Sequence, residues 1–332
     1  MKTFDEISTI LNDKITDLCD ETSEIAKSVK SKTLYDTIKY ALQQGGKRMR
    51  PLLLLLSSDV NGGNLEDAIY PALGLEIFHN FTLVHDDIMD KANIRRNHPT
   101  VYKKWNQNIA ILTGDTMFAT AVNFVTKTRD DLIKPILTEF CKTAIEVCDG
   151  QQFDMDFEST DEVCIHDYIE MIRLKTAVVI ASALKIGSFI GNADEITQNA
   201  LYKYGEAMGI AFQLMDDFLD IYGDSKVFGK NTGGDITCCK KTFPYLTAIK
   251  NACNKDEKDN LIQLYNNTTI DNSEKITIVT SLFNKYNVKQ TTLNAVKQYQ
   301  KEANKWLDIA HLSAEAKEAL SDYSNKLFYR TY

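Results

Sequence analysis

Residues 76–90 read EIFHNFTLVHDDIMD, an apolar stretch that ends on three acidic residues. The stretch predicts a core helix, on which Asp86 and Asp90 project from one face, one turn apart, with Asp87 beside them. Residues 212–220, FQLMDDFLD, repeat the pattern D-D-x-x-D after another apolar helical stretch. Both acidic triplets are therefore expected at the ends of core helices rather than on charged outer faces.

Helical spacing of apolar residues continues through almost the whole chain. Near the N-terminus it is seen at Ile7, Ile10, Leu11, Ile15 and Leu18. Strand-like alternation is rare, no hairpin dipeptide joins two alternating runs, and short breaks such as Gly45-Gly46 connect the helices. The five prolines are dispersed, and no Pro/Gly/Ser-rich linker divides the chain. The sequence thus predicts an all-α fold, with residues 1–332 in a single domain built from long helices.

Composition limits the classes of function. With 332 residues, of which 44% are hydrophobic and 25% charged, the chain has the composition of an ordinary globular protein. Its formal net charge of −8 argues against a general nucleic-acid binder, although local basic clusters could still hold a small phosphorylated substrate. Seven scattered cysteines without a C-x-x-C spacing predict reduced thiols in a cytosolic protein. The lack of a signal-peptide core or long apolar run predicts a soluble, cytoplasmic protein with no transmembrane segment.

The acidic triplets predict metal binding. Like charges at this spacing destabilise a helix by a few tenths of a kcal/mol per pair, so three carboxylates packed this way favour a bound cation. Oxygen-only ligands select a hard ion, and Mg²⁺ takes one or two carboxylates together with waters and substrate phosphates. Two such triplets on neighbouring helices would hold a diphosphate through bridging metal ions. The predicted metal ligands are Asp86, Asp87, Asp90, Asp216, Asp217 and Asp220.

Cationic residues accompany the acidic ones. Residues 45–51, GGKRMRP, hold three cations beside two glycines, and Arg95-Arg96 follow the first acidic triplet. Glycine lets the backbone approach an anion closely, and arginine binds phosphate oxygens through two parallel hydrogen bonds. Each cluster alone is more often solvated surface charge, but beside two metal sites they indicate two phosphorylated substrates held at once. Further cationic segments contain Lys175-Thr176, Gly229-Lys230 and Lys240-Lys241-Thr242.

In this order the motifs resemble the trans-isoprenyl diphosphate synthases, the family of farnesyl, geranylgeranyl and longer polyprenyl diphosphate synthases. The resemblance runs from about Gly45 to Thr242 through GGKRMRP, EIFHNFTLVHDDIMD, RRNHPT, LTGDTMF, GQQFDMDFE, LKTA, FQLMDDFLD and FGKNTGGDI…KKT. It implies an orthogonal bundle of long helices around a central cavity, the isoprenoid synthase fold, in a homodimer. It also implies that three Mg²⁺ assist ionisation of an allylic diphosphate, whose cation is attacked by the alkene of isopentenyl diphosphate.

The resemblance assigns residues position by position. The first and second aspartate-rich motifs are matched by the six aspartates named above. Residues that bind isopentenyl diphosphate are matched by Lys47, Arg50, His79 and Arg96. Residues that bind the allylic diphosphate are matched by Arg95, Lys175, Lys230 and Lys240, and those that face the reacting carbon by Thr176 and Gln213. The expected catalytic residues are Asp86, Asp87, Asp90, Asp216, Lys175 and Gln213.

Product length is predicted from the residues that precede the first triplet. A helix rises about 5.4 Å per turn, so residues one and two turns before Asp86 line the depth beneath the metal site. Thr82 lies one turn back and Phe78 two turns back, with Phe81 beside them. In the resembled family, an aromatic residue at the position of Phe81 limits elongation. These residues favour a C20 or C15 product over very long chains.

Four alternatives stay open at the level of sequence. One is a synthase of longer chains. A class I terpene cyclase would use a similar first motif, but its second metal motif resembles N-D-x-x-S-x-x-x-E, and it needs no isopentenyl diphosphate pocket. An inactive regulatory subunit usually loses motif aspartates, whereas all six are present here. A di-iron carboxylate bundle could use Glu76 and His79 as an E-x-x-H pair, but the chain supplies no second E-x-x-H.

Overall fold

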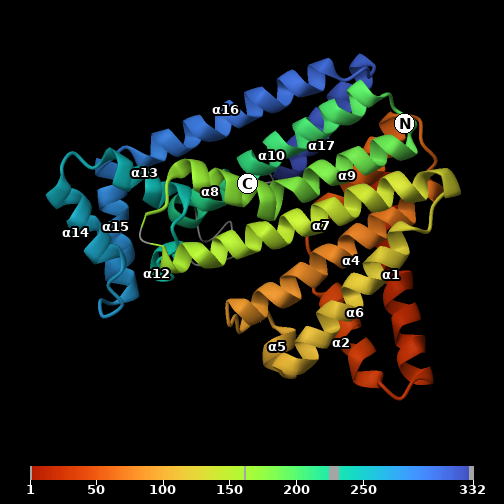
Figure 1. Ribbon diagram of the computed structural model, residues 1–332, viewed down its shortest axis with the longest axis horizontal. Helices are drawn as coiled ribbons and strands as arrows, with labels where there is room; N and C mark the ends of the chain where they lie inside the picture. The colour runs from red at the N-terminus through yellow and green to blue at the C-terminus, as the bar shows by residue number, and fades with distance from the viewer. Residues whose placement is uncertain (1, 161, 224–231, 329–332) are drawn as a thin grey trace. The chain divides into compact units, whose positions relative to one another are not determined.

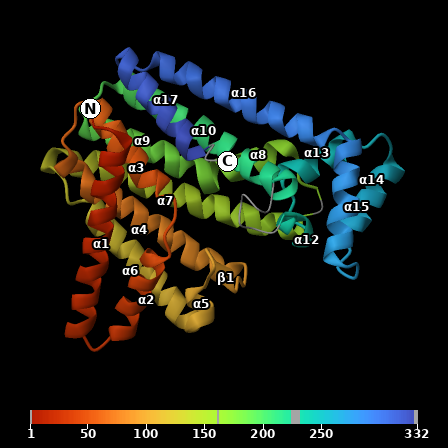
Figure 2. The same ribbon diagram turned by 180° about the vertical axis from the view of Figure 1, so that it is seen from behind.

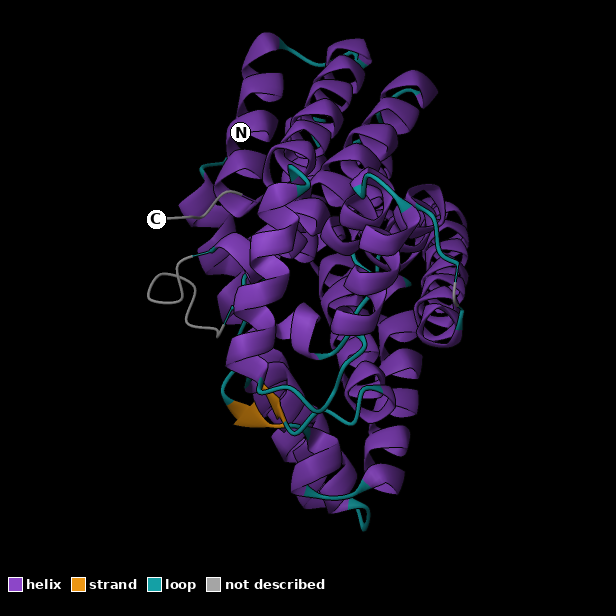
Figure 3. Ribbon diagram, turned by 90° about the vertical axis from the view of Figure 1, so that its left-hand side faces the viewer, coloured by secondary structure: helices purple, strands orange, loops and turns teal. Residues whose placement is uncertain are grey.

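The computed structural model describes residues 2–160, 162–223 and 232–328, most of which are helical (Figures 1 and 3). The predicted all-α class is confirmed. Backbone contacts divide the chain into two compact units, the first formed by Met1–Lys142, Ser182–Leu201 and Ala310–Leu327, the second mainly by Thr143–Ala181 and Tyr202–Ile309. That residues 1–332 form one domain stays a prediction. In the described ranges, no helix has both the length and the apolar character needed to cross a membrane.

The first unit is built around a long buried helix, α4. Its elements are α1 (Phe4–Ser28), α2 (Lys32–Gln43), α3 (Met49–Val60), α4 (Leu65–Met89), β1 (Ile94–Arg95), β2 (His98–Pro99), α5 (Val101–Lys104), α6 (Gln107–Val125) and α17 (Ala314–Phe328). Figure 2 shows α1 and α2 side by side, in agreement with their contacts. Helix α4 packs against α3 and α6, and it is buried over most of its length because it is apolar on nearly every face.

The second unit surrounds its own apolar core. Its elements are α8 (Ile165–Ile172), the π-helical turn η1 (Arg173–Ala177), α12 (Gly234–Thr237), α13 (Phe243–Asn251), α14 (Lys255–Tyr265), α15 (Asn272–Lys285) and α16 (Val288–Ile309). Three further helices contribute residues to both units: α7 (Asp130–Ser159), α9 (Val178–Ile190) and α10 (Glu195–Tyr222). The core includes Leu214 of α10, Leu246 of α13 and Phe283 of α15.

The ends of α4 differ in their electrostatics. At the N-terminus, the side chain of Asn64 accepts a hydrogen bond from the amide of Glu66 at 3.1 Å, and acidic residues occupy the first turn. Both features stabilise a helix start. At the C-terminus, Asp86 and Asp87 occupy the last turn and Asp90 is the capping residue. Carboxylates are unfavourable at the negative end of a helix, so this arrangement indicates a site for a cation.

A short hairpin follows α4 (Figure 3). Strands β1 and β2 pair antiparallel, with Ile94 opposite Pro99 and Arg95 opposite His98. The two turn residues, Arg96 and Asn97, have φ of 50° and 64°, as a tight type I′ turn requires. The sequence did not predict this hairpin, because strands of two residues are too short for any alternation.

Candidate active site

The first aspartate-rich motif is paired with an arginine of the hairpin. Asp87 is only 4% exposed, Asp86 is half-buried and Asp90 is exposed. The Arg95 Nε lies 2.7 Å from Asp87 Oδ1, and its Nη2 lies 3.2 Å from Asp86 Oδ2. Burial raises the pKa of Asp87, and the Arg95 guanidinium opposes that rise. Arg95, predicted to bind the allylic diphosphate, thus lies directly against two predicted metal ligands.

Arg50 and His79 form a second polar pair in the first unit. The Arg50 Nη1 lies 3.2 Å from His79 Nε2, and the two residues come from α3 and α4. Arginine can only donate hydrogen bonds, so Nε2 is the acceptor and the ring proton resides on Nδ1. Burial lowers the pKa of His79 well below its usual value, and the nearby cations Arg50 and Arg96 lower it further. A neutral His79 therefore orients the Arg50 guanidinium without adding charge.

The double glycine accommodates a third predicted ligand of isopentenyl diphosphate, Arg96. The Arg96 Nη1 donates a hydrogen bond to the carbonyl oxygen of Gly45. A Cβ atom at Gly46 would lie 2.6 Å from Arg96 Nη2, and Gly46 has φ of 131°, so any other residue would displace the Arg96 guanidinium and strain the backbone. Arg50, His79 and Arg96 thus belong to one structured region, whereas the fourth predicted ligand, Lys47, is exposed and lies two residues before α3.

Glu76 is a buried member of the same region that the sequence suggested only as an iron ligand. Its side chain is 5% exposed, and its Oε1 accepts a hydrogen bond from Asn80 Nδ2 at 3.1 Å. Burial raises the pKa of Glu76, while the Asn80 hydrogen bond and the Arg50 charge lower it. Because His79 Nε2 is directed at Arg50, the Glu76–His79 pair is not arranged as a pair of metal ligands.

In the second unit, Asp217 of the second aspartate-rich motif accepts the last hydrogen bond of a series that connects three side chains. Asp217 is 3% exposed and accepts hydrogen bonds from the Tyr168 hydroxyl and, at 3.1 Å, from Gln213 Nε2. The Gln213 Oε1 in turn accepts one from Thr176 Oγ1 at 3.3 Å. Thr176 and Gln213, both predicted to face the reacting carbon, are therefore neighbours. Tyr168 is an addition that spacing could not reveal, since it lies on α8, 49 residues from Asp217.

Carboxylates accumulate at this end of α10. Burial raises the pKa of Asp217 to about 8, and the Asp235 charge adds to the rise. Burial also raises the pKa of Asp235 to about 7, with Asp220 as the next cause. The Asp220 carboxylate accepts hydrogen bonds from the amides of Gly234 at 3.2 Å and Asp235 at 3.0 Å. Asp216 is exposed. Several carboxylates that repel one another at a partly buried position favour a cation.

Lys175 lies in the π-helical turn η1, between α8 and α9. Its Nζ lies 2.6 Å from Asp154 Oδ2 of α7. A Cβ at Gly150 would lie 2.3 Å from the Lys175 amide nitrogen, and one at Gly209 would lie 2.6 Å from Ala177 Cα, so both glycines permit close packing against the turn. Single π-helical turns occur frequently at functional sites because they redirect side chains within a helix. The sequence predicted Lys175 but neither the widened turn nor its Asp154 partner.

Of the two remaining predicted cations, Lys240 and Lys230, the structure describes only Lys240. Lys240 is exposed, and its carbonyl oxygen accepts a hydrogen bond from the Tyr265 hydroxyl at 2.6 Å. Lys230 lies outside the described residues. In residues 2–160, 162–223 and 232–328, no three His, Cys, Asp or Glu side chains are close enough together to hold a metal ion by themselves.

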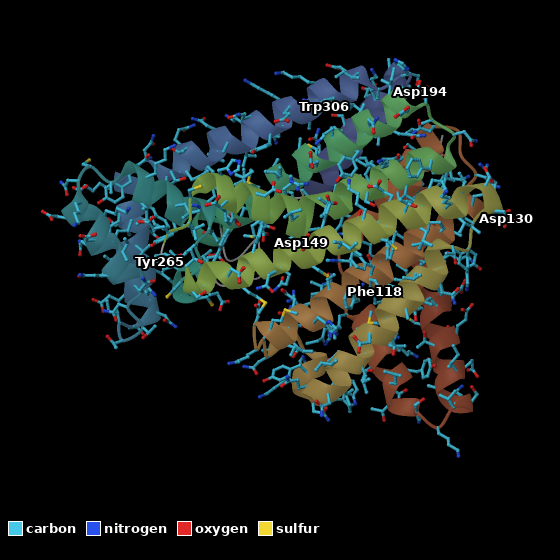
Figure 4. All side chains as sticks on the ribbon, viewed as in Figure 1. Phe118, Asp130, Asp149, Asp194, Tyr265 and Trp306 are labelled. Carbon is cyan, nitrogen blue, oxygen red and sulfur yellow. The ribbon has the colours of Figure 1, made fainter. Side chains whose placement is uncertain are left out.

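The predicted chain-length residues contribute to an aromatic cluster in the first unit. Phe78 and Phe81 of α4 have ring centroids 5.6 Å apart, and Phe81 lies 5.4 Å from Phe118 of α6, which Figure 4 labels. Phe78 lies 5.2 Å from Phe140 of α7. Phe118 and Phe140 were not predicted, because no spacing rule links α4 to two other helices. Phe78 is buried in this cluster, Phe81 is half-buried, and Thr82 Oγ1 donates to the His79 carbonyl oxygen at 2.8 Å.

Known proteins are similar to this chain in sequence and in fold. The sequence model of the polyprenyl synthetases matches residues 31–282. A geranylgeranyl diphosphate synthase of Methanosarcina mazei is 38% identical over 70% of this chain and 72% of its own. A short chain isoprenyl diphosphate synthase of Methanothermobacter thermautotrophicus is 34% identical over 95% of this chain and 96% of its own.

Solved structures of similar proteins have the same fold as this chain. A geranylgeranyl pyrophosphate synthetase from Pyrococcus horikoshii superposes with a TM-score of 0.88 at 32% identity, covering 98% of this chain and 99% of its own. A crystal structure of a geranylgeranyl pyrophosphate synthase gives a TM-score of 0.91 at 38% identity and covers both chains fully, 100% of each. The expected isoprenoid synthase fold is confirmed by these likenesses. Since the family match spans most of the sequence and the relatives match over most of their length, the chain belongs to the polyprenyl synthetase family.

Proposed function

We propose that the protein is a Mg²⁺-dependent trans-prenyltransferase that joins isopentenyl diphosphate head to tail to an allylic diphosphate. The observation that carries this proposal is the pair of D-D-x-x-D segments on α4 and α10, each with its second aspartate almost completely buried. The Arg50–His79 pair supports the transferase over a terpene cyclase, which needs no second diphosphate site. The presence of all six motif aspartates supports an active enzyme over a regulatory subunit.

The donor set fits Mg²⁺. Asp86, Asp87 and Asp90 on α4, and Asp216, Asp217 and Asp220 on α10, offer only oxygen donors, as this hard cation prefers. Burial raises the pKa of Asp87 and of Asp217, so a bound cation would stabilise the ionised form of each carboxylate. Bound Mg²⁺, which we expect as three ions, would stabilise the negative charge that develops on the departing pyrophosphate. Substrate phosphates and waters would complete the coordination.

The other residues bind and orient the substrates. We assign Arg50, Arg96 and Lys47, with His79 as the orienting residue, to the diphosphate of isopentenyl diphosphate, because arginine pairs bind such groups bidentately. We assign Arg95, Lys175, Lys230 and Lys240 to the allylic diphosphate. Thr176 and Gln213 would lie beside the reacting carbon, where their dipoles stabilise positive charge after the C–O bond breaks. The alkene then attacks C1, and the departed pyrophosphate accepts the proton that is lost.

We further propose a cytoplasmic homodimer. Leu112 on α6 is 57% exposed, and neighbouring Ile111 is also exposed, so α6 offers an apolar surface that a second copy could cover. All seven cysteines are free, as is usual in a reducing compartment. Sedimentation equilibrium of the purified protein would test the dimer, which a monomer at micromolar concentration would contradict.

The activity can be tested directly. Purified protein is supplied with labelled isopentenyl diphosphate, Mg²⁺ and dimethylallyl, geranyl or farnesyl diphosphate in separate reactions, and the products are dephosphorylated and chromatographed. The expected result is incorporation of label that depends on the allylic substrate. A hydrocarbon product formed from the allylic diphosphate alone would instead identify a terpene cyclase, and no turnover of any substrate would identify an inactive subunit.

Arg50→Met is expected to raise KM for isopentenyl diphosphate by about 10- to 100-fold, because hydrogen bonds to charged groups contribute about 1.5–3 kcal/mol each. KM for the allylic substrate should change little. Lys47→Ala should have a smaller effect of the same kind, since Lys47 is exposed, and Lys230→Ala should mainly affect the allylic substrate. The measurement is steady-state kinetics with one substrate varied at a time.

Lys14→Met is the matched control for these variants, because Lys14 is an exposed lysine whose partner is Asp17 of the same helix. Its kinetics should match those of the wild type. Equal effects of Arg50→Met on both substrates would overturn the assignment of separate diphosphate sites.

Phe81→Ala is expected to lengthen the product, favoured here as C20, by at least one isoprene unit. Forcing extra methylenes into a packed core costs about 1–3 kcal/mol, so removing the Phe81 ring removes the obstacle to further elongation of the product. Phe81 is the better choice than Phe78, whose complete burial predicts a loss of about 3–5 kcal/mol of stability on truncation. Chromatography of dephosphorylated products measures the shift. Tyr70→Ala, which removes a 42% exposed ring of α4 that packs on Phe124 outside the four-phenylalanine cluster, should leave product length unchanged.

A further inference from the structure

A lysine in the second unit is buried without a carboxylate partner. Lys275 of α15 is 1% exposed, although lysine is almost never fully buried unless it is paired. In the described part of the chain, no Asp or Glu oxygen lies within ion-pair distance of its Nζ. Instead Nζ lies 3.2 Å from the Sγ of Cys239 and 5.7 Å from the centroid of the Tyr265 ring.

Cys239 is held against this lysine by its own local structure. It follows α12 and has φ of 56°, in the left-handed region that few residues other than glycine adopt. Its Sγ lies 3.2 Å from the Tyr265 carbonyl oxygen and 3.2 Å from Lys275 Nζ, so the sulfur is fixed between two groups. Cys239 is half-buried, so part of the residue is accessible to a small oxidant, and the neighbouring Cys238 is exposed.

The pair lies where α12 meets α15. A Cβ at Gly233, the residue before α12, would lie 2.6 Å from Ile276 Cγ1, so only glycine permits this contact beside Lys275. The Tyr265 hydroxyl, on the residue labelled in Figure 4, donates to the carbonyl oxygens of Lys240 at 2.6 Å and Asp235 at 3.2 Å. Cys239 therefore lies between Asp235 and Lys240 in the same short segment.

We propose that Cys239 and Lys275 are a site of reversible oxidative cross-linking. Hydrogen peroxide first oxidises the Cys239 thiol to a sulfenic acid: an S–O bond forms, the O–O bond breaks, and one water leaves. The Lys275 amine then attacks the sulfur, an S–N bond forms, the S–O bond breaks, and a second water leaves. The balanced reaction consumes one thiol, one amine and one peroxide and yields one sulfenamide and two waters.

Proximity is the reason why Lys275 captures the sulfenic acid. Sulfenic acids condense readily with a nearby nitrogen, and a nucleophile already placed near contact distance reacts as an intramolecular partner of very high effective concentration. Two equivalents of a thiol reductant reverse the reaction by returning the thiol and the amine and forming one disulfide of the reductant. Among the described residues, no such amine is paired with the exposed Cys238, which is expected to proceed to higher, unlinked oxidation states.

The mass of the cross-link tests the proposal. Full-length protein is treated with peroxide and digested, and the peptides containing residues 239 and 275 are analysed. The expected product is the two peptides joined with a loss of about 2 Da, since two hydrogens leave in total. Dithiothreitol should separate them again. Joined peptides that have instead gained oxygen, or unlinked Cys239 in a higher oxidation state, would overturn the proposal.

Variants identify the two atoms involved. Cys239→Ser and Lys275→Met should each abolish the cross-link, whereas Cys238→Ser should form it as the wild type does. Lys275→Met replaces the buried side chain with an unbranched apolar one that is one atom shorter, and circular dichroism would establish that the variant folds. If that variant is unstable, Cys239→Ser and the wild-type mass still decide the question. A cross-link that survives Cys239→Ser, or that disappears in Cys238→Ser, would assign the chemistry to another cysteine.

The cross-link would also regulate activity, a consequence that rests on the proposed function. Joining Cys239 to α15 restricts the segment that contains Lys240, so peroxide should lower prenyl transfer several-fold and dithiothreitol should restore it. The mass measurement needs no substrate. A protein that forms the cross-link but has no prenyltransferase activity would therefore contradict the proposed function alone, and an active enzyme without the cross-link would contradict this inference alone.

Discussion

Exhaustive chelation with EDTA is expected to abolish turnover, lowering the rate by at least about 10³-fold, because a metal ion contributes several kcal/mol to stabilising a departing oxyanion. Added Mg²⁺ should restore the rate. The expectation follows from the carboxylates themselves. Asp217 is 3% exposed and Asp87 4% exposed, and burial raises the pKa of both, so each requires a cation to remain ionised at low cost.

The control for chelation is a parallel sample that receives EDTA already saturated with Mg²⁺. This sample should retain full activity, which separates metal removal from any effect of the chelator on the protein. Circular dichroism before and after chelation should be unchanged. Undiminished turnover of a metal-free sample, verified by elemental analysis, would overturn the proposal that metal ions bind the diphosphate.

Replacing Asp86 or Asp216 with alanine is expected to lower kcat by about 10²–10³-fold, the usual consequence of removing a major electrostatic stabiliser. Neither change should unfold the protein, since Asp86 is half-buried and Asp216 is exposed. Asp86→Ala also removes the acceptor of the Arg95 Nη2 hydrogen bond, but Arg95 Nε retains its hydrogen bond to Asp87 at 2.7 Å. The measurement is kcat at saturating Mg²⁺ and substrates, with thermal denaturation as the check on folding.

Asp131→Ala is the matched control for the aspartate variants. Asp131 is an exposed aspartate in the first turn of α7, where it pairs with Arg129, and it belongs to neither motif. Its removal should leave kcat unchanged. If Asp86→Ala and Asp131→Ala lowered kcat equally, the first motif would have no special part in catalysis. A normal kcat in Asp216→Ala would remove the second motif from the mechanism in the same way.

The sequence by itself determined the helical class and the position of both aspartate triplets. Helical periodicity is a local property, since side chains three and four residues apart share a face whatever the rest of the chain does. For that reason Asp86, Asp87 and Asp90 could be placed at the end of one helix, and Asp216, Asp217 and Asp220 at the end of another. Both placements agree with the observed ends of α4 and α10.

Only the tertiary structure decided which side chains meet. Arg50 and His79 are 29 residues apart, Lys175 and Asp154 are 21 apart, and Tyr168 and Asp217 are 49 apart. Such pairs depend on how helices pack, and packing is specified by glycines such as Gly150 and Gly209 that let backbones approach, rather than by any repeat. The widened turn at Lys175 and the buried Lys275–Cys239 contact have the same origin. Local spacing can place a residue on a helix face, but the residue opposite it is chosen by the packing of the whole unit.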